Sequence, residues 1–193
     1  MDLTIKPVTK DNVNDYLYFF DNMQFKENSD WNICYCYSYH FIGTAEEWNN
    51  KEKNRDSAYR LIREGKMRGY LAYKDNMAIG WCNANDKMNY ERLRLYDDIR
   101  TGEPQNIGSI VCFVIDPRYR NQKVATNLLK RVCDDYKEKG YRMIEAYPEK
   151  KTCGMEDHFA GPLSMYMKQN FKIIKEFDNY YIIQKQLNDE NKF

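Results

Sequence analysis

Hydrophobic and polar positions follow one another in short blocks, which predicts a chain of alternating strands and helices. The clearest block is Ile110–Ile115, which is apolar at every position and therefore predicts a strand covered on both faces. Asp116 and Pro117 end that strand, because proline removes a ladder donor. The next segment is apolar at helical spacing (Val124, Leu128, Leu129, Val132 and Tyr136), so we expect a helix from about Lys123 to Gly140.

Further strands are expected from apolar runs that are bounded by turn residues. These runs are Leu3–Val8, Met67–Tyr73, Met77–Ala84, Arg142–Tyr147, Phe171–Glu176 and Tyr180–Gln186. Tight turns at residues 74–76 and 178–179 predict that four of these strands form two hairpins. Strands that alternate with helices along the chain are typical of an α/β domain.

Three more helices are expected from capping signals. Thr9 is a candidate cap for a helix through Phe20, and a capping box at Thr44–Glu47 begins one that reaches about Glu64. A short helix follows Gly161. The segments without a clear period are Asn22–Gly43, Asn89–Ile99, Glu149–Asp157 and the tail from Leu187. We expect the first to be an aromatic loop over a cleft and the second to be a short helix or a surface insertion. We expect the third to be a polar loop and the tail to be disordered.

Composition excludes several classes of function. The 193 residues contain 30 Lys and Arg against 29 Asp and Glu, a net charge of +1 without a polybasic tract, which argues against nucleic acid or an anionic membrane as partner. No apolar run approaches the roughly 20 residues that span a bilayer, and the first residues lack a signal peptide. One cytoplasmic domain is therefore expected.

The six cysteines are expected to be reduced (Cys34, Cys36, Cys82, Cys112, Cys133 and Cys153). Their spacing, with only two histidines in the chain, does not fit a metal site. Cys34, Cys36 and Cys82 leave open a covalent acyl-enzyme route, in which a thiolate takes an acyl group first. No histidine spacing supports their activation, and packing is the simpler interpretation.

The junction between the central strand and its helix is the best candidate site. The first turn of a helix offers unsatisfied N–H groups and the positive end of the macrodipole, a combination that favours phosphate. Arg120 and Lys123 add positive charge to this turn. The alternative is an ordinary strand, turn and surface helix.

The spacing of this junction favours the functional interpretation. Residues 120–125, RNQKVA, resemble the R/Q-x-x-G-x-G/A loop that binds acetyl-CoA in the GNAT superfamily of N-acetyltransferases, and the preceding VIDPRYR is similar to that family too. W-C-N at Trp81, I-E-A-Y-P at Ile144 and F-A-G-P-L-S-M at Phe159 resemble a poorly characterised bacterial branch of it.

The resemblance implies a single GNAT-like domain over residues 1–193, with a mixed, mostly antiparallel central sheet flanked by helices. It implies acetyl-CoA as co-substrate and a small-molecule or peptide amine as acceptor. The residues it assigns to the cofactor are Phe113, Val114, Ile115, Arg120, Asn121, Gln122, Lys123, Val124, Ala125 and Thr126. A homodimer is compatible with the sequence and is not decided by it.

Two glycine positions of the family differ here. Lys123 stands where the family has a glycine that lets backbone approach the pyrophosphate. If residue 123 is helical, its φ is negative and lysine is tolerated, with a looser phosphate cradle. Asn170 replaces the glycine of a late Y-x-x-x-G-F element, and asparagine tolerates the left-handed conformation well.

The resemblance also suggests catalytic residues. Tyr166, in the late element, corresponds to a tyrosine that can protonate the departing thiolate. The central strand has no glutamate to serve as base, so Glu145 on the adjoining strand is the best substitute, facing either the cleft or solvent. His40 and His158 are weaker candidates. The leading hypothesis is direct acetyl transfer, and the alternative is a non-catalytic acyl-CoA sensor or interaction module.

Overall fold

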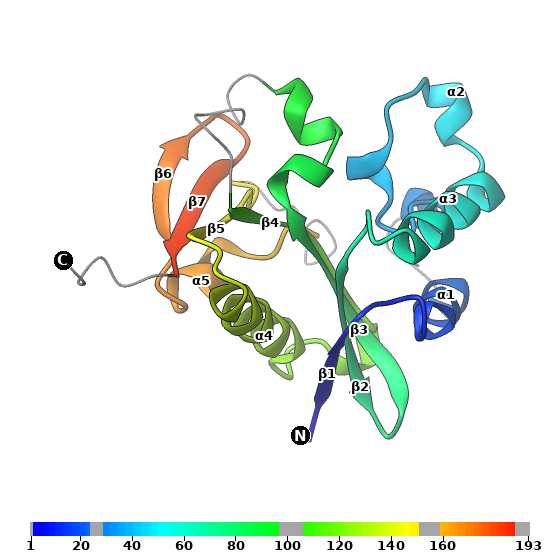
Figure 1. The fold of residues 1–193 in the computed structure, drawn as a ribbon, viewed down its shortest axis with the longest axis horizontal. Helices are drawn as coiled ribbons and strands as arrows, with labels where there is room; N and C mark the ends of the chain where they lie inside the picture. Colours follow the sequence, from blue (N-terminus) through cyan, green and yellow to red (C-terminus); the bar gives the residue numbers. More distant parts are fainter. Residues whose placement is uncertain (1, 24–28, 97–105, 151–158, 188–193) are drawn as a thin grey trace.

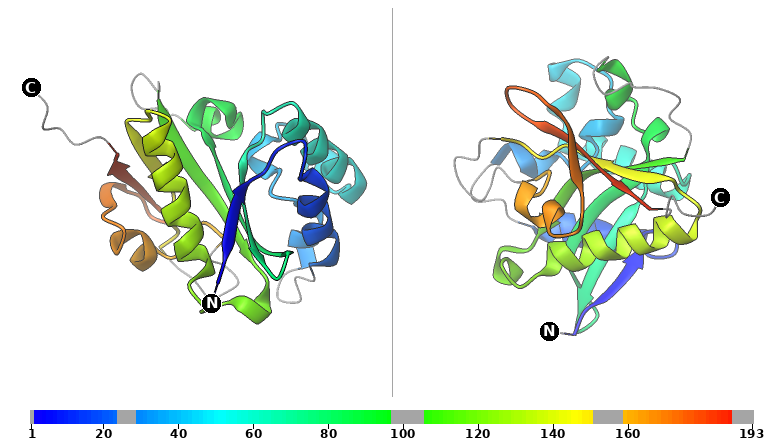
Figure 2. Two further views of the ribbon diagram at one scale, coloured as in Figure 1. Left: turned by 60° about the horizontal axis from the view of Figure 1, so that its bottom comes forward. Right: turned by 90° about the vertical axis from the view of Figure 1, so that its left-hand side faces the viewer.

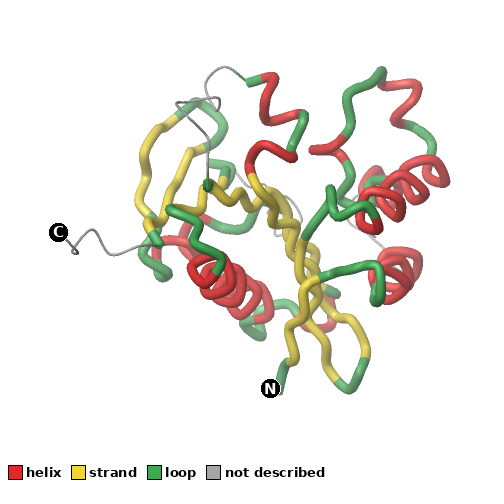
Figure 3. The backbone as a smooth tube through the Cα atoms, viewed as in Figure 1, coloured by secondary structure: helices red, strands yellow, loops and turns green. Residues whose placement is uncertain are grey.

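The computed structural model describes residues 2–23, 29–96, 106–150 and 159–187. Its strands are β1 (Thr4–Pro7), β2 (Gly69–Lys74), β3 (Met77–Asp86), β4 (Ile107–Ile115), β5 (Met143–Ala146), β6 (Lys172–Glu176) and β7 (Tyr181–Gln186). Its α-helices are α1 (Val13–Asn22), α2 (Ala45–Trp48), α3 (Lys51–Arg63), α4 (Val124–Glu138) and α5 (Leu163–Met167). Short 3-10 turns are η1 (Ser29–Ile33), η2 (Ser38–His40), η3 (Lys87–Asn89), η4 (Arg92–Leu95) and η5 (Pro117–Tyr119). Figure 3 shows how these helices and turns surround the strands.

The strands form one sheet in the order β1-β2-β3-β4-β5-β7-β6. Neighbouring strands are antiparallel except β4 and β5, which are parallel. This confirms the predicted mixed, mostly antiparallel sheet flanked by helices. The β4–β5 pairing covers only Ile107–Ile110 of β4, so the second half of that strand extends past its neighbour.

Two helical layers cover the sheet. The helices α1 and α3 lie on one face and α4 on the other (Figure 1), and the rotated views in Figure 2 separate these layers. Each face has its own buried cluster of apolar side chains, with Trp81 and Tyr16 central to the first and Leu128 and Ile110 in the second. Because both faces are covered, the central strands are apolar almost throughout.

A β-bulge interrupts the pairing of the two central strands. Asn83 pairs with Cys112 and Ala84 with Ile110, so Val111 of β4 has no partner residue on β3. An extra residue on one strand bends it and increases its twist. The bulge lies where β5 stops pairing with β4, so it helps to turn the end of β4 away from β5.

Most of the predicted elements are present with small shifts of their ends. The β2–β3 hairpin turns at Asp75 and Asn76, which have φ of 49° and 61°. The capping box exists, since the Thr44 N–H donates to Glu47 Oε2 at 3.0 Å and the Glu47 N–H to Thr44 Oγ1 at 3.2 Å. Asn170 has φ 63°, so the left-handed conformation predicted for it is confirmed.

Three element predictions were wrong in detail. The helix expected from Ala45 to Glu64 is two helices, because Asn50 caps α3 by accepting from the Lys53 N–H at 2.9 Å, a local bond that competes with helix continuation. Thr9 does not cap α1, whose N-cap position is Asn12. Leu187 is not disordered, because it is buried and its N–H donates to the Arg142 carbonyl at 2.9 Å.

Other uncertain segments are partly described. The segment expected as a short helix or insertion contains η3 and η4, and residues 97–105 lie outside the described residues. Of the predicted polar loop, Glu149 forms an isolated bridge with Tyr180, and residues 151–158 lie outside the description, as does the tail from 188. In the described ranges, no helix is long and apolar enough to cross a membrane.

Candidate active site

A cavity of about 500 Å³ lies along the second half of β4, beyond the part of this strand that pairs with β5. Its walls come from the second half of β4, the start of α4, the segment leading into α5, and the aromatic segment of residues 31–48. Lining residues such as Phe20 and Cys36 belong to the buried cluster on the α1 face, whereas Phe113 and Val124 belong to the α4 face. The cavity therefore joins the two faces of the sheet.

The predicted cofactor residues are gathered at one end of this cavity. All of them except Gln122 line it, which brings together Phe113, Val114, Ile115, Arg120, Asn121, Lys123, Val124, Ala125 and Thr126. Gln122 is exposed, and its side-chain amide donates to the Arg118 carbonyl at 2.9 Å. That hydrogen bond closes the turn, so the Gln122 side chain stabilises the turn and does not face the cavity.

The start of α4 presents backbone N–H groups to the cavity. The first helical hydrogen bond runs from the Asn127 N–H to the Lys123 carbonyl at 3.0 Å, so the N–H groups of Val124, Ala125 and Thr126 precede the helical ladder. Lys123 occupies the N-cap position and makes no side-chain capping bond there. These donors and the helix dipole suit a bound phosphate.

Lys123 is not helical, so the expectation of a negative φ was wrong. Its φ of 64° and ψ of 15° place it in the left-handed conformation that glycine adopts freely. The physical reason is that the chain reverses sharply from the η5 turn into α4. Asn121, with φ 60°, is left-handed as well. Lysine at residue 123 therefore carries a strain of roughly 1 kcal/mol that the family's glycine avoids.

Replacing Lys123 separates the effect of its backbone from that of its charge. Lys123→Ala keeps the Cβ and removes the charge, so we expect acetyl-CoA to bind about 3- to 10-fold more weakly. Lys123→Gly should bind it more tightly than Lys123→Ala, because glycine lets the backbone approach the pyrophosphate without a Cβ. It should also be about 1 kcal/mol more stable to unfolding than Lys123→Ala, because the left-handed strain is relieved. Calorimetric titration and urea denaturation measure both quantities. Equal affinity and stability of the two variants would contradict this account.

The turn before α4 is held by an ion pair. Arg118 Nη2 lies 2.6 Å from Asp116 Oδ2, and its Nε donates to the same carboxylate. Burial alone would raise the pKa of Asp116, but the bonds from Arg118 outweigh it and lower that pKa. Asp116 is therefore ionised and remains paired with Arg118. Arg120, whose Nε donates to the Ile115 carbonyl at 3.3 Å, reaches the cavity instead.

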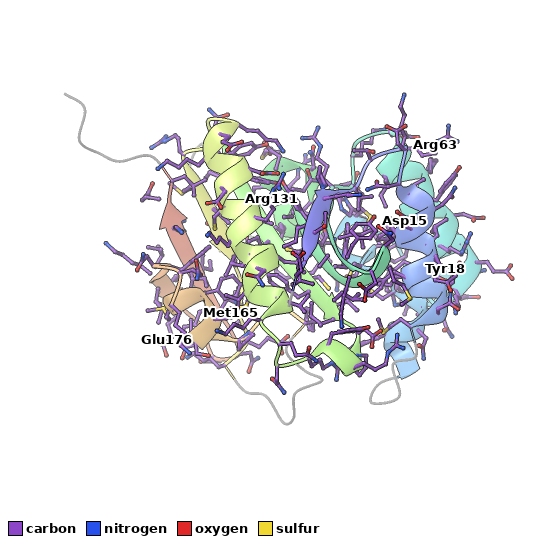
Figure 4. The ribbon with its side chains drawn as sticks, turned by 90° about the horizontal axis from the view of Figure 1, so that it is seen from below. Asp15, Tyr18, Arg63, Arg131, Met165 and Glu176 are labelled. Atoms are coloured by element: carbon purple, nitrogen blue, oxygen red, sulfur yellow. The ribbon has the colours of Figure 1, made fainter. Side chains whose placement is uncertain are left out.

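Tyr166 lies beneath the cavity wall. Its side chain is fully buried, its hydroxyl donates to the Ala160 carbonyl at 2.7 Å, and its ring packs against Phe113 and Phe171. Its neighbours Gly161 and Met165 line the cavity, and Figure 4 labels Met165 near α5. Burial raises the pKa of Tyr166. The geometry thus ties the hydroxyl to the segment that forms the wall.

Glu145 faces neither the cleft nor solvent, which corrects both orientations considered for it. Its side chain is fully buried, and Oε1 lies 2.7 Å from Lys87 Nζ. The Tyr147 hydroxyl donates to the same oxygen at 2.6 Å, and Gln184 Nε2 donates to Oε2 at 2.8 Å. The reason is that Lys87, from η3, folds back over the sheet, which sequence spacing did not indicate.

A hydrogen-bonded chain connects this ion pair to the cavity wall. Ser109 Oγ lies 3.2 Å from the Tyr147 hydroxyl, and the carbonyl of the same serine lies 3.4 Å from the Tyr90 hydroxyl. The Tyr90 hydroxyl also donates to Asn83 Oδ1 at 2.8 Å. Asn83 in turn donates to the Cys36 carbonyl at 2.9 Å. The sequence analysis missed Asn83 and Ser109, which are polar residues inside apolar strands, and Lys87, which lies in η3, because their partners are far away in sequence.

The aromatic segment forms the other end of the cavity, as expected for a loop over a cleft. Trp31 packs edge-on against Phe159 with ring centroids 6.3 Å apart, and Trp48 stacks on Tyr37 at 6.3 Å. Trp31, Tyr39, Trp48 and Phe159 all line the cavity. Trp48 was not singled out from the sequence, because it was placed inside one continuous helix.

Three cysteines line the cavity as well. Cys36 Sγ lies 2.7 Å from Cys112 Sγ, and both are free thiols, as is Cys34. Burial raises the pKa of Cys34 to about 11, and it also raises the pKa of Cys36 well above its usual value, so both stay protonated near neutral pH. Cys82 is buried and does not line the cavity. A protonated thiol is a poor nucleophile, which disfavours the covalent route.

No metal centre is formed by the part of the chain that the structure describes, since no three His, Cys, Asp or Glu side chains are grouped to hold an ion. His158 lies outside the described residues. His40 is buried against the Tyr90 ring at 5.0 Å, and its Nε2 has no hydrogen-bond partner among the described residues. It is not one of the residues that line the cavity.

His40 makes stability depend on pH. Burial lowers the pKa of His40 from 6.5 to about 4, so the unfolded chain takes up a proton first as the pH falls. The neutral His40 side chain contributes fully to the free energy of unfolding above pH 6.5, and this contribution is lost as the pH falls from 6.5 to 4. Between pH 7 and pH 4.5 the wild-type protein should lose about 2 to 3 kcal/mol more of its free energy of unfolding than the His40→Gln variant does. Urea denaturation at the two pH values measures this difference. An unchanged pH dependence would contradict this.

The sequence of residues 25–157 matches the model of the acetyltransferase (GNAT) family, over more than half of the chain. The chain belongs to the GNAT acetyltransferase family. Its predicted identity, fold and acyltransferase class are thereby confirmed, and the family's acyl donor is acetyl-CoA. The late element around Tyr166 and Asn170 lies beyond the matched residues. A search of curated protein sequences finds no significant match.

Solved structures share the fold of this GNAT protein at low sequence identity. PaiA N-acetyltransferase from Thermoplasma acidophilum, in complex with coenzyme A, has 15% identity and a TM-score of 0.56, covering 96% of this chain and 99% of its own. The ribosomal-protein-S18-alanine N-acetyltransferase from Escherichia coli has 10% identity and a TM-score of 0.57, and the match covers 100% of this chain and 99% of its own. YncA from Salmonella typhimurium with acetyl-CoA has 11% identity and a TM-score of 0.53, covering 100% and 98%.

Proposed function

We propose that this GNAT protein transfers an acetyl group from acetyl-CoA directly to a primary amine. The observation that carries the proposal is a single cavity that joins the start of α4 to the aromatic segment across the divergence of β4 and β5. Such a cavity would let acetyl-CoA at the α4 wall and an acceptor at the aromatic wall meet beside β4. Three of the structures with this fold are N-acetyltransferases or bind acetyl-CoA, which supports the same activity.

The residues at the α4 end fit acetyl-CoA. The N–H groups of Val124, Ala125 and Thr126 would hold the pyrophosphate, and the cationic side chains of Arg120 and Lys123 would neutralise it. When bound, acetyl-CoA supplies an acyl group activated as a thioester.

The apolar stretch of β4 would position the pantetheine arm. The Phe113 N–H donates to the Phe159 carbonyl at 2.5 Å, so one of the backbone donors predicted for that arm already has a protein acceptor. We propose that the arm lies along Val114 and Ile115, which line the cavity beyond that bond.

Titration with acetyl-CoA tests the binding site. The wild-type protein should bind it saturably in calorimetry, and Arg120→Ala should weaken binding about tenfold, the loss of one charge-assisted contact. Absence of binding at millimolar acetyl-CoA would refute the proposal. A non-catalytic acyl-CoA sensor is the second candidate, favoured by the strained Lys123, and it would bind acetyl-CoA without releasing CoA for any amine.

For Tyr166 the geometry supports a positioning role beside the predicted role of general acid. We expect Tyr166→Phe to lower the free energy of unfolding by about 1 to 2 kcal/mol, because the buried Ala160 carbonyl loses its donor. A positioning role predicts a raised KM for acetyl-CoA with kcat little changed. A fall in kcat of about 100-fold at constant KM would instead establish the general acid. Steady-state kinetics and thermal unfolding distinguish the two.

The remaining expectations stay predictions. A peptide amine and a small-molecule amine are both compatible with the family, and neither the homodimer nor the cytoplasmic location is tested. Gel filtration with light scattering would measure the oligomeric state. The role of Glu145 as base also stays untested, and its burial in an ion pair makes a structural role the simpler account.

A further inference from the structure

The charges that line the cavity are distributed unevenly. Among the described lining residues, Arg120 and Lys123 alone carry a charge at neutral pH, and both are cationic and lie at the α4 end. Burial keeps Cys34 protonated at the other end, and it raises the pKa of Tyr39. The described wall therefore offers no carboxylate that would attract an ammonium group or take its proton.

The nearby carboxylates lie outside the cavity lining. Glu145 is bound by Lys87, Tyr147 and Gln184, and Asp116 is bound by Arg118. Glu149 is close enough to Tyr39 to contribute to raising its pKa, and it has an interaction of its own. None of the three lines the cavity. An alkyl amine, which is an ammonium ion near neutral pH, would have to lose both its proton and its hydration on entering this apolar end, and that is costly.

The shape and chemistry of the acceptor end favour a flat apolar ligand. Trp31, Trp48 and Phe159 present rings to the cavity, and Trp48 is held against Tyr37 and Phe41. Rings fixed by their own packing offer faces and edges on which an aromatic ligand gains contact beyond area burial alone. These walls lie across β4 from the proposed acetyl-CoA site.

We propose that the acceptor of this enzyme is an aromatic primary amine, whose nitrogen is bonded directly to the ring and is neutral at physiological pH. This inference rests on the proposed acetyl transfer and names its substrate class. The amine nitrogen bonds to the acyl carbon, the carbon–sulfur bond breaks, and the proton lost by nitrogen ends on the sulfur of CoA. A neutral amine needs no base before it attacks, which agrees with the uncharged wall.

Two isomeric amines test the proposal. In 4-methylaniline the nitrogen is attached to the ring, and in benzylamine one methylene separates them, so size and composition are equal. At pH 7, CoA release with 4-methylaniline should have a kcat/KM at least about tenfold higher than with benzylamine. Between pH 6.5 and 8 the first rate should stay flat, whereas the second should rise up to about tenfold per pH unit as benzylamine loses its proton.

A matched pair of variants tests the uncharged wall. Ser38 lines the acceptor end, so Ser38→Asp adds a carboxylate there and Ser38→Asn adds a neutral side chain of the same shape. The ratio of the rates for 4-methylaniline and benzylamine should fall about fivefold or more in the aspartate variant relative to the asparagine variant. An equal ratio in the two variants would count against the proposal.

An aromatic wall variant completes the test. Trp48→Leu should raise the KM for 4-methylaniline and leave the Kd of acetyl-CoA unchanged, with Tyr18→Leu as control. Tyr18 is 61% exposed on α1 and lies away from the sheet in Figure 4. If Trp48→Leu does not fold, the Ser38 pair still decides.

Failure of this inference is distinguishable from failure of the proposed function. Binding of acetyl-CoA with preferred turnover of benzylamine or a peptide amine would refute the aromatic acceptor and leave the transferase intact. Binding without turnover of any amine would refute both the aromatic acceptor and the transferase, and would establish the sensor. No binding of acetyl-CoA would refute all three.

Discussion

Glu145→Gln is expected to destabilise the protein by about 3 to 5 kcal/mol, because it removes the charge that compensates a buried lysine ammonium. Lys87 Nζ and Glu145 Oε1 are 2.7 Å apart, and the two side chains are 6% and 0% exposed. An isolated charge at such a site has lost its hydration and gains nothing in return. Glutamine preserves the shape, so packing changes do not explain a large loss. Urea denaturation at pH 7 measures it.

A second substitution identifies the cause of that loss. In Glu145→Gln combined with Lys87→Met, neither charge is present, and much of the lost stability should return. If Glu145→Gln unfolds within 1 kcal/mol of wild type yet loses activity, the ion pair is not structural, and Glu145 would be the base predicted from sequence. Kinetics of the folded variant at several pH values would then show the loss of one ionisation.

Ala125→Asp is expected to weaken acetyl-CoA binding by about 100-fold, because it places a negative charge where the pyrophosphate would bind. Ala125 lies in the first turn of α4 and lines the cavity. The same aspartate interacts favourably with the positive end of the helix, so the free protein should gain about 0.3 to 1 kcal/mol of stability. Stability and affinity should therefore change in opposite directions. Calorimetric titration and thermal unfolding measure the two effects.

Asn127→Asp is the matched control for this charge. Asn127 is exposed, does not line the cavity, and projects from α4 about 200° around the helix from Ala125. It should change the affinity for acetyl-CoA less than about fivefold, since solvent screens it. Equal weakening by both variants would show that the effect is one of overall charge. No weakening by Ala125→Asp would place the phosphates elsewhere.

Local sequence patterns were sufficient for much of the fold because their causes are local. The apolar run of β4, the helical spacing of α4 and the capping box at Thr44 each depend on residues within a few positions. Asn170 adopts its left-handed conformation for the same kind of reason. The break between α2 and α3 was missed because helical spacing was weighed above the capping capacity of Asn50.

The grouping of the predicted cofactor residues at one cavity was also accessible from the sequence. They are nearly contiguous from Phe113 to Thr126, so one strand and one helix suffice to bring nine of the ten to the cavity. The conformation of Lys123 was not predictable from spacing, because it depends on how the η5 turn meets α4. Thr44 and Asn50 precede their helices with a negative φ, whereas Lys123 precedes α4 with a positive one, so only the folded turn decides the sign of φ at that position.

The sequence by itself indicated a GNAT acetyltransferase, which the family match confirmed, and it predicted that the central strand and the helix after it hold the cofactor, because those patterns depend on neighbouring residues. Tertiary structure alone decided the environment of Glu145 and the composition of the acceptor end. Lys87, Tyr147 and Gln184 come from separate segments to surround one carboxylate, and Trp31, Trp48 and Phe159 do the same around one cavity. Contacts between residues far apart in sequence produce no local sequence pattern, because they form only when the folded sheet brings its two faces and their loops together.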